Sequence, residues 1–293
     1  MILVDYSQTS ISTLMAELKG NTTAQINVPL IRHMIVNALR GYKSKFSYEY
    51  GPMVICCDDR RYWRKEAFPH YKVNRKKSRD SSGFDWSSIF EALNQIKQEV
   101  AEFLPYPVIE VSGAEADDVI ASLVLWEHTK TFPESPTPIM ILSGDHDFQQ
   151  LQRYPDVKQY SPIEKRAVVA KGDIEELLRE HIICGDRGDS IPNFLSPDDV
   201  FVSLSGERQK GIRKTNLAKW KTMQPEEYIT DPVLLKNYKR NERLVDLRLV
   251  PLEIQTAAVD SYVLQRNARN RSRLLDYFTK NEMRNMIEHL SEF

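Results

Sequence analysis

Short apolar runs, each followed closely by an acidic residue, recur along the first half of the chain. Ile2–Val4, Met53–Cys57 and Ile139–Leu142 have the length and unbroken hydrophobicity of strands that are buried on both faces of a sheet. A fourth run, Val108–Val111, is shorter. Segments with helical spacing of apolar residues lie between these runs. Because strand and helix patterns alternate, we predict an α/β fold with a largely parallel sheet.

Helices are predicted where apolar residues recur every three to four positions. Val28–Phe46 shows this period. Asp85 is a suitable N-cap for a helix over residues 86–104, which two prolines then end. The Ser112-Gly-Ala-Glu115 stretch is a capping-box pattern, which would begin a helix that continues to about Leu125.

Beyond about residue 173 the pattern contains helices and no convincing strand. We therefore place a domain boundary near Ile183. Residues 1–183 are predicted to form an α/β core, in which residues of about 60–80 form a separate segment, and residues 184–293 a helical region. The predicted helices of the second half are Ile174–Ile183, Pro197–Leu204, Val233–Leu244, Ile254–Leu264 and Arg273–Leu290.

Composition excludes several classes of protein. Apolar residues make up 41% of the 293 residues, which is enough for a core and argues against a disordered chain. Three cysteines, two of them adjacent, do not suggest a disulfide framework or a zinc site. The sequence shows no secretory signal and no long apolar segment. We expect a cytoplasmic protein and a monomer.

Nine carboxylates form the candidate site. In a parallel sheet the carboxyl ends of the strands share one edge, so acids that follow the strands should converge there. Two further acids lie in the glycine-rich loop 184–192. The nine are Asp5, Asp58, Asp145 and Asp147 after strands, Glu115, Asp117 and Asp118 at a helix start, and Asp186 and Asp189 in the loop.

Such a concentration of like charge raises the pKa of each carboxyl unless cations neutralise it. Oxygen ligands without His or Cys favour Mg²⁺, with Mn²⁺ as a substitute. Two such ions about 4 Å apart can catalyse in-line displacement at phosphorus. The simpler alternatives are that the Asp145 and Asp147 pair begins a helix, where the helix dipole favours Asp, and that Glu115 serves only in the capping box.

Residues 60–79 contain nine Lys or Arg and one acid. Cations bind phosphates and aromatic faces stack on unpaired bases, so the segment is a candidate nucleic-acid interface, although basic runs are often merely solvated. A second basic turn resembles a P-loop, but Ile212 replaces the required lysine. The candidate interface comprises Arg60, Arg61, Arg64, Tyr71, Lys72, Arg75, Lys76 and Lys77, with Arg208, Lys210, Arg213 and Lys214 in the second turn; the interleaved aromatic residues are Tyr62, Trp63, Phe68 and Tyr71.

A series of motifs in the first two thirds of the chain resembles the structure-specific 5′-nuclease (flap endonuclease) family. The series covers roughly residues 1–195 and is specific as a set. It comprises Leu3-Val-Asp5-Tyr-Ser7, Cys57-Asp58, Tyr62-Trp-Arg64, Tyr71-Lys72, Asn74-Arg75, Glu115-Ala-Asp-Asp118, Ser143-Gly-Asp-His-Asp-Phe148 and Gly185-Asp-Arg-Gly-Asp189.

The resemblance implies a PIN-like core and a two-Mg²⁺ phosphodiesterase. The expected activity is that of a 5′→3′ exonuclease, flap endonuclease and ribonuclease H on RNA–DNA and DNA duplexes, removing RNA primers in phage-type replication. The basic segment would form an arch from which Lys72 and Arg64 reach the scissile phosphate. One ion would be bound by Asp5, Asp58, Glu115, Asp117 and Asp145, and the other by Asp147, Asp186 and Asp189, with Asp118 nearby.

After Asp189 the sequence lacks the glycine-rich duplex-binding loop that is usual in the family. The sequence therefore does not predict whether a K⁺ ion binds in this region. Two other functions also remain: a phosphatase of the DxD type and a non-catalytic nucleic-acid-binding module. The last residues, 283–293, could recruit a sliding clamp or single-strand-binding protein through an apolar helical face. The alternative is that this face packs on the protein's own core.

Overall fold

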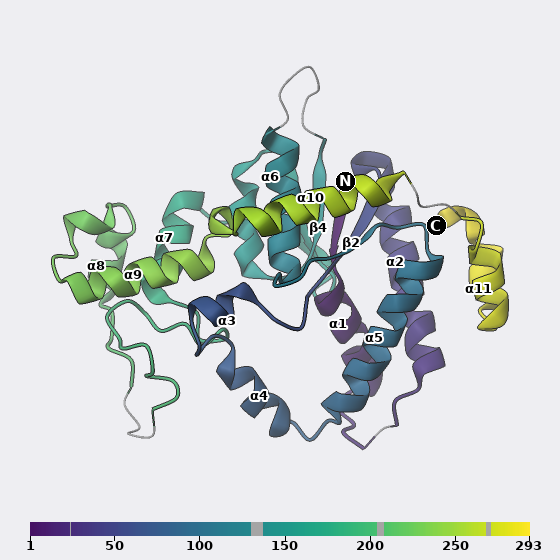
Figure 1. The fold of residues 1–293 in the computed structure, drawn as a ribbon, viewed down its shortest axis with the longest axis horizontal. Helices are drawn as coiled ribbons and strands as arrows, with labels where there is room; N and C mark the ends of the chain where they lie inside the picture. Colours follow the sequence, from purple (N-terminus) through teal and green to yellow (C-terminus); the bar gives the residue numbers. More distant parts are fainter. Residues whose placement is uncertain (24, 130–136, 204–207, 268–270) are drawn as a thin grey trace. The chain divides into compact units, whose positions relative to one another are not determined.

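The computed structural model describes residues 1–23, 25–129, 137–203, 208–267 and 271–293. The chain forms two compact units, each made of segments distant in sequence (Figure 1). Unit 1 contains Met1–Arg60, Phe84–Val169 and Pro251–Phe293, and unit 2 contains Arg61–Gly83 and Ala170–Val250. Among the described residues, no helix is both long enough and apolar enough to cross a membrane. The predicted domain boundary near residue 183 stays a prediction.

Unit 1 is built on a six-stranded sheet with the strand order β3-β2-β1-β4-β5-β6. The first five strands run parallel, and β6 pairs antiparallel with β5. The predicted α/β class and mostly parallel sheet are therefore confirmed. The strands are β1 (Ile2–Asp5), β2 (Met53–Cys57), β3 (Val108–Glu110), β4 (Ile139–Leu142), β5 (Val157–Ser161) and β6 (Arg166–Val168).

Helices cover this sheet. Apolar residues of β1, β2 and β4 pack with the buried faces of α2 and α5 in one large core, and α6 and α10 lie side by side (Figure 1). The unit 1 helices are α1 (Tyr6–Leu18), α2 (Val28–Tyr50), α5 (Trp86–Phe103), α6 (Ala116–Thr129), α10 (Leu252–Arg266), α11 (Leu274–Lys280) and α12 (Arg284–Glu288), with 3₁₀ helices η1 (His146–Arg153) and η4 (Leu290–Glu292).

Two predicted helix starts have different outcomes. Asp85 caps α5 as predicted, since its carboxylate accepts a hydrogen bond from the Ser88 N–H at 3.1 Å. The capping box at Ser112 is wrong, because α6 begins only at Ala116. The Glu115 N–H donates instead to Asp118 Oδ2 at 2.9 Å, so a carboxylate inside the helix satisfies this amide.

The C-terminal apolar face is part of the core of unit 1. The predicted helix 273–290 is interrupted, because residues 281–283 separate α11 from α12. Met283, Met286 and Phe293 are each at most 3% exposed and belong to the core, and Ile287 packs against it. The apolar face of the tail therefore packs on the protein's own core, as the alternative states, and recruitment of a sliding clamp or single-strand-binding protein stays a prediction.

Unit 2 has a smaller core of its own. Helices α7 and α9 pack together, and Asn241 of α9 joins them by donating to the Ile182 carbonyl at 2.8 Å. Pro197–Ser203 forms turns and not the predicted helix, and Leu204 lies outside the described residues. The elements are α3 (Trp63–Ala67), α4 (Val73–Asp80), α7 (Ile174–Cys184), α8 (Lys214–Trp220) and α9 (Pro232–Val245), with η2 (Pro225–Glu227) and η3 (Leu247–Leu249).

Candidate functional site

Asp5 and Asp58 lie at the carboxyl ends of neighbouring strands in unit 1. Asp5 ends β1 and caps α1: its Oδ1 accepts from the Gln8 N–H at 2.9 Å and its Oδ2 from the Ser143 hydroxyl at 3.1 Å. Asp58 follows β2 and accepts from the Ala116 N–H at 2.8 Å. The Ser7 hydroxyl donates to its other oxygen at 2.5 Å. These donors orient both carboxylates without neutralising their charge.

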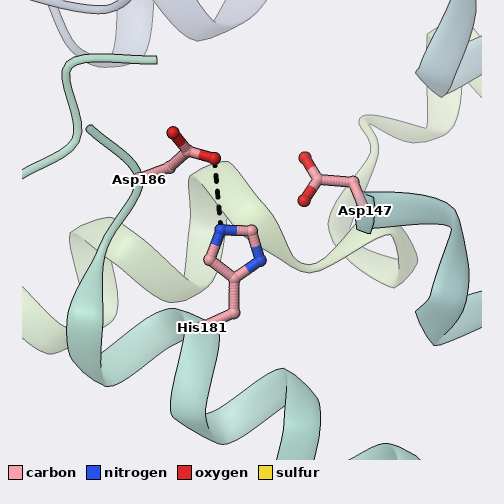
Figure 2. Close-up of side chains that lie close together, drawn as sticks. All are labelled: Asp147, His181 and Asp186. Carbon is pink, nitrogen blue, oxygen red and sulfur yellow. Dashed lines mark ion pairs between the residues drawn. The ribbon is translucent and has the colours of Figure 1, made fainter. Parts of the chain in front are cut away.

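Asp145 and Asp147 follow β4 at the same edge of the sheet. Asp145 caps η1 by accepting from the Asp147 N–H at 3.0 Å, and Asp147 lies in the first turn of η1 (Figure 2). The helix-start interpretation is therefore correct for the local backbone. The Gln159 amide of β5 donates to the Asp145 carbonyl at 2.6 Å, which secures this turn to the sheet.

The electrostatics connect three of these carboxylates. Burial, followed by the charge of Asp58 and more weakly that of Asp145, raises the pKa of Asp5 to about 7. Asp5 is only 7% exposed, so water screens these charges poorly. The strand order thus brings Asp5, Asp58 and Asp145 to one edge, where in the absence of cations the other two charges destabilise the charged form of Asp5.

The raised pKa of Asp5, caused first by burial and then by this repulsion, predicts a pH-dependent stability. Between its ordinary value of 3.8 and about 7, the Asp5 carboxyl is protonated in the folded chain and ionised in the unfolded chain. The unfolded state then binds fewer protons, so stability falls as pH rises through this window. In EDTA, we expect urea unfolding to show a loss of roughly 2–3 kcal/mol from about pH 5 to about pH 8.

Two matched variants test whether Asp5 is the residue responsible for this loss of stability. Asp5→Asn should remove most of the loss, because the amide does not titrate. Asp85→Asn, at another capping aspartate of unit 1, should leave it unchanged. Equal losses in the wild type and in Asp5→Asn would show that Asp5 is not the group that titrates.

The acids of α6 differ in their environments. Glu115 is 2% exposed, Asp118 is fully buried, and the half-buried Asp117 lies in the first turn of the helix. The hydrogen bond from the Glu115 N–H holds Asp118 as part of the helix start. The Ala116 N–H, which donates to Asp58, connects this helix start with the end of β2.

Unit 2 presents the loop that contains Asp186 and Asp189. The His181 imidazole Nε2 lies 3.4 Å from Asp186 Oδ2 (Figure 2). This partner, with the backbone N–H groups of Asp189 and Gly188, lowers the pKa of Asp186 to about 2. Sequence reasoning missed His181, although its position in the last turn of α7, just before the acidic loop, was an available signal.

Asp189 is the acceptor for three side chains of the basic segment, all within unit 2. Its carboxylate accepts from the Tyr71 hydroxyl at 3.0 Å and from Arg75 at 2.5 Å, and the Lys72 Nζ lies 3.5 Å away. The Lys72 N–H also donates to the Asp189 carbonyl at 2.8 Å. The acidic loop and the basic segment are thus joined through both side chain and backbone.

Three of the four aromatic residues of the basic segment are buried, and Tyr62 is half-buried. Trp63, Phe68 and Tyr71 are 8%, 3% and 3% exposed, and the last two belong to the core of unit 2. This corrects the stacking interpretation for these three residues: α3 is too short to be stable alone, and Phe68 and Tyr71, which follow it, attach the segment to the core of unit 2. Arg64 is also buried and donates to the Leu244 carbonyl at 2.9 Å; its predicted contact with a phosphate stays a prediction.

The exposed part of the candidate interface is cationic. Arg75, Lys76 and Lys77 of α4 face solvent, and no apolar residue of that helix is buried. The second basic turn is also exposed and partly lies outside the described residues, at 204–207. It does not connect two helices, because the preceding helix does not form. The other exposed cations are Arg60, Arg61, Arg208, Lys210, Arg213 and Lys214.

Comparison with solved structures defines the fold. A bacteriophage T5 5′-exonuclease with bound divalent zinc ions superposes with a TM-score of 0.56 at 17% identity, covering 90% of this chain and 99% of that one. A T5 flap endonuclease in a pseudo-enzyme–product complex with DNA and metal ions gives 0.57 at 16%, covering 90% and 98%. The architecture is that of the 5′-nucleases.

The sequence comparisons show the family. Residues 2–179 match the model for the 5′-3′ exonuclease N-terminal resolvase-like domain, and residues 172–293 match that for the C-terminal part of T4 RNase H. The chain therefore belongs to the 5′→3′ exonuclease family, whose members hydrolyse phosphodiester bonds. It is 31% identical to the ribonuclease H of Enterobacteria phage T4 over 99% of this chain and 95% of that one. The resemblance predicted from the motifs is confirmed.

Proposed function

We propose that this protein is a Mg²⁺-dependent 5′→3′ exonuclease and flap endonuclease that hydrolyses RNA–DNA and DNA duplexes and removes RNA primers. Membership of the nuclease family supports this function over a phosphatase or a non-catalytic binding module. The observation that carries the proposal is the group of Asp5, Asp58 and Asp145 at one sheet edge, with the pKa of Asp5 raised to about 7.

The donor set fits hard divalent cations. Its side chains offer carboxylate oxygens, and a cation among them would relieve the repulsion that, together with the larger effect of burial, raises the pKa of Asp5. Asp5, Asp58, Glu115, Asp117 and Asp145 would hold one ion. When bound, such ions supply charge that stabilises a phosphorane-like transition state and acidifies water.

The protein's own contribution is to hold these carboxylates in place. Hydroxyls of Ser7 and Ser143 and the backbone N–H of Ala116 donate to Asp58 and Asp5, and such outer partners orient ligands and tune their basicity. The assignment of Asp147, Asp186 and Asp189 to a second ion rests on the family motifs. Mn²⁺ should substitute for Mg²⁺ because both prefer oxygen ligands.

One assay tests the proposal directly. A 5′-labelled RNA primer annealed to DNA is incubated with the protein in Mg²⁺ and, separately, in EDTA. We expect short products released from the 5′ end in Mg²⁺ only, and parallel reactions on a DNA duplex and a 5′ flap rank the substrates. Absence of cleavage on all three in Mg²⁺ and in Mn²⁺ would contradict the proposal.

The exposed cations of α4 predict a steep dependence of affinity on salt. Each phosphate that a cation neutralises adds about 0.9 to the slope of log affinity against log salt on duplex DNA. The variant carrying both Lys76→Ala and Lys77→Ala should therefore reduce the slope by about 2 units. Filter binding in Ca²⁺ over a salt series measures it.

The matched control removes two cations from another helix of unit 2. Lys236 and Lys239 are exposed on α9, and Lys239 is already paired with Glu242 at 3.0 Å. Their double alanine variant should keep the wild-type slope. An unchanged slope in the α4 variant would mean that its lysines are only solvated.

A further inference from the structure

Asn241 of α9 joins the two ends of the acidic loop 184–192 in unit 2. The residue is fully buried, and its amide Nδ2 donates to two backbone carbonyls, those of Ile182 and Pro192, each at 2.8 Å. Ile182 lies in the last turn of α7, where carbonyls have no partner within the helix. Because α9 lies beside α7 (Figure 1), a single side chain reaches both the entry and the exit of the loop.

Arg240 fixes the orientation of this amide. Its guanidinium donates to Asn241 Oδ1 from Nε at 2.9 Å and from Nη2 at 2.8 Å, so the amide nitrogen faces the two carbonyls. The same Nη2 donates to the Pro192 carbonyl at 3.0 Å. Arg240 is itself held by an ion pair with Asp198 and lies over the Phe68 ring, 5.3 Å from its centroid.

The backbone of the loop has conformations that require such external support. Ser190 is fully buried and has a left-handed φ of 59°, which is unfavourable for a residue with a side chain. Gly185 has a φ of 65°, and a Cβ there would lie 2.6 Å from the Pro192 carbonyl carbon. Strained backbone persists only where its surroundings determine it, so the contacts at the ends of the loop maintain its shape.

Hydrogen bonds inside the loop connect its ends to the two carboxylates. The Ile191 N–H donates to the Asp186 carbonyl at 2.7 Å, and the Asp189 N–H donates to Asp186 Oδ1 at 3.0 Å. Ile191 directly precedes Pro192, whose carbonyl accepts from α9. A shift of Pro192 would therefore move Ile191 and, through it, both acids.

We propose that Asn241 is a positioning residue of the nuclease, which holds Asp186 and Asp189 where they bind a divalent cation. Its amide acts through the Ile182 and Pro192 carbonyls, and partners behind the ligands of a metal commonly determine its affinity. This inference rests on the proposed function, because that function assigns the two carboxylates to a cation.

Asn237, one turn earlier on α9, provides a matched control. It is 7% exposed, and its Nδ2 donates to the Phe194 and Ser196 carbonyls, each at 3.1 Å. These acceptors lie beyond the loop. Asn237→Ala and Asn241→Ala each remove a buried amide that donates to two carbonyls, so both should lower the melting temperature, but only Asn241→Ala releases the ends of the loop.

The first measurement is amide hydrogen exchange of the full chain in EDTA. In Asn241→Ala the N–H groups of Asp189 and Ile191 should exchange at least about tenfold faster than in the wild type, because the loop opens more often. In Asn237→Ala they should exchange at the wild-type rate. This comparison needs neither a bound cation nor cleavage.

The second measurement is a calorimetric titration with Mn²⁺ alone, without nucleic acid. Asn241→Ala should weaken the binding of one Mn²⁺ about tenfold or more, and Asn237→Ala should bind Mn²⁺ like the wild type. The Mg²⁺ concentration that gives half the maximal single-turnover rate should rise in Asn241→Ala only.

A milder variant keeps the inference testable if Asn241→Ala does not fold. Arg240→Lys retains a positive charge beside Asp198 but cannot contact Asn241 Oδ1 and the Pro192 carbonyl with one planar group. It should shift the exchange rates and the Mn²⁺ affinity in the same direction as Asn241→Ala, by several-fold.

Two results would overturn the inference. Equal behaviour of Asn241→Ala and Asn237→Ala in either measurement would show that Asn241 only stabilises the core of unit 2. Faster exchange in the loop with unchanged Mn²⁺ affinity would show that its conformation does not control cation binding. Failure of the proposed function has a different signature, because the wild type itself would then bind no Mn²⁺ and cleave no substrate.

Discussion

Replacing Asp145 with asparagine is expected to abolish cleavage while DNA binding stays equal or becomes tighter. Asp145 follows β4 and its charge contributes to the raised pKa of Asp5, which places it among the proposed metal ligands. Asparagine retains the cap of η1, because both residues are good N-caps, but it removes the negative charge that a cation requires. We expect the variant to lose several kcal/mol of transition-state stabilisation, so its cleavage rate should fall at least about a thousandfold.

Single-turnover cleavage in Mg²⁺ and a binding titration in Ca²⁺ measure the two effects separately. Affinity should not fall, because a negative charge has been removed from a site that approaches a phosphate. Asp85→Asn is the matched control: it makes the same chemical change at the N-cap of α5, where the carboxylate only accepts from Ser88. Near-normal cleavage by Asp145→Asn would exclude this carboxylate from the metal centre.

The central strands could be predicted because both of their faces are buried. Ile2–Asp5 and Ile139–Leu142 are fully buried runs, and a parallel sheet then brings the following acids to one edge. The outer strands β5 and β6 were harder to predict. Strand β5 alternates buried and exposed residues and β6 has three residues, so neither has an apolar run. Helix α1 was missed since polar Thr9 and Ser10 occupy buried positions, which obscures its period.

Residues of the candidate site could be predicted only where their position in the sequence, directly after a strand, determines where they lie. Strand ends identified Asp5, Asp58 and Asp145, whereas the partners of Asp189 come from 114 and 118 residues away in the sequence. No local pattern indicates such contacts. The aromatic residues of the basic segment show a different error, in which a local pattern predicted a contact that the fold does not make. Interleaved rings suggested stacking on bases, but Phe68 and Tyr71 pack in the core of unit 2, because a small unit needs these large side chains.

Lys72→Ala is expected to lower the single-turnover rate on the order of 10²-fold and to weaken DNA binding far less. The family resemblance assigns the basic segment to the arch, and we propose that its ammonium group contacts phosphate oxygens as charge develops on them. A donor that acts only in the transition state changes the rate more than the affinity. Lys76→Ala and Lys77→Ala, as phosphate contacts, should do the reverse.

The structure also provides a competing explanation, since the Lys72 Nζ lies 3.5 Å from Asp189. In this explanation Lys72 acts only by holding that carboxylate in place. Arg75→Ala separates the two roles: it breaks a closer contact of 2.5 Å with Asp189 and leaves Lys72 intact. Alanine keeps the Cβ of Lys72 and thus leaves the strain of its left-handed backbone, with φ of 56°, unchanged.

If Lys72 is catalytic, Arg75→Ala should retain most of the rate and Lys72→Ala should not. Comparable loss in both variants would show that Lys72 acts through Asp189. A normal rate for Lys72→Ala at saturating DNA would reduce Lys72 to an anchor. Arginine at position 72 restores the charge with a different shape, so the Lys72→Arg variant should recover affinity but little of the rate, because the guanidinium cannot reproduce a point charge at the same place.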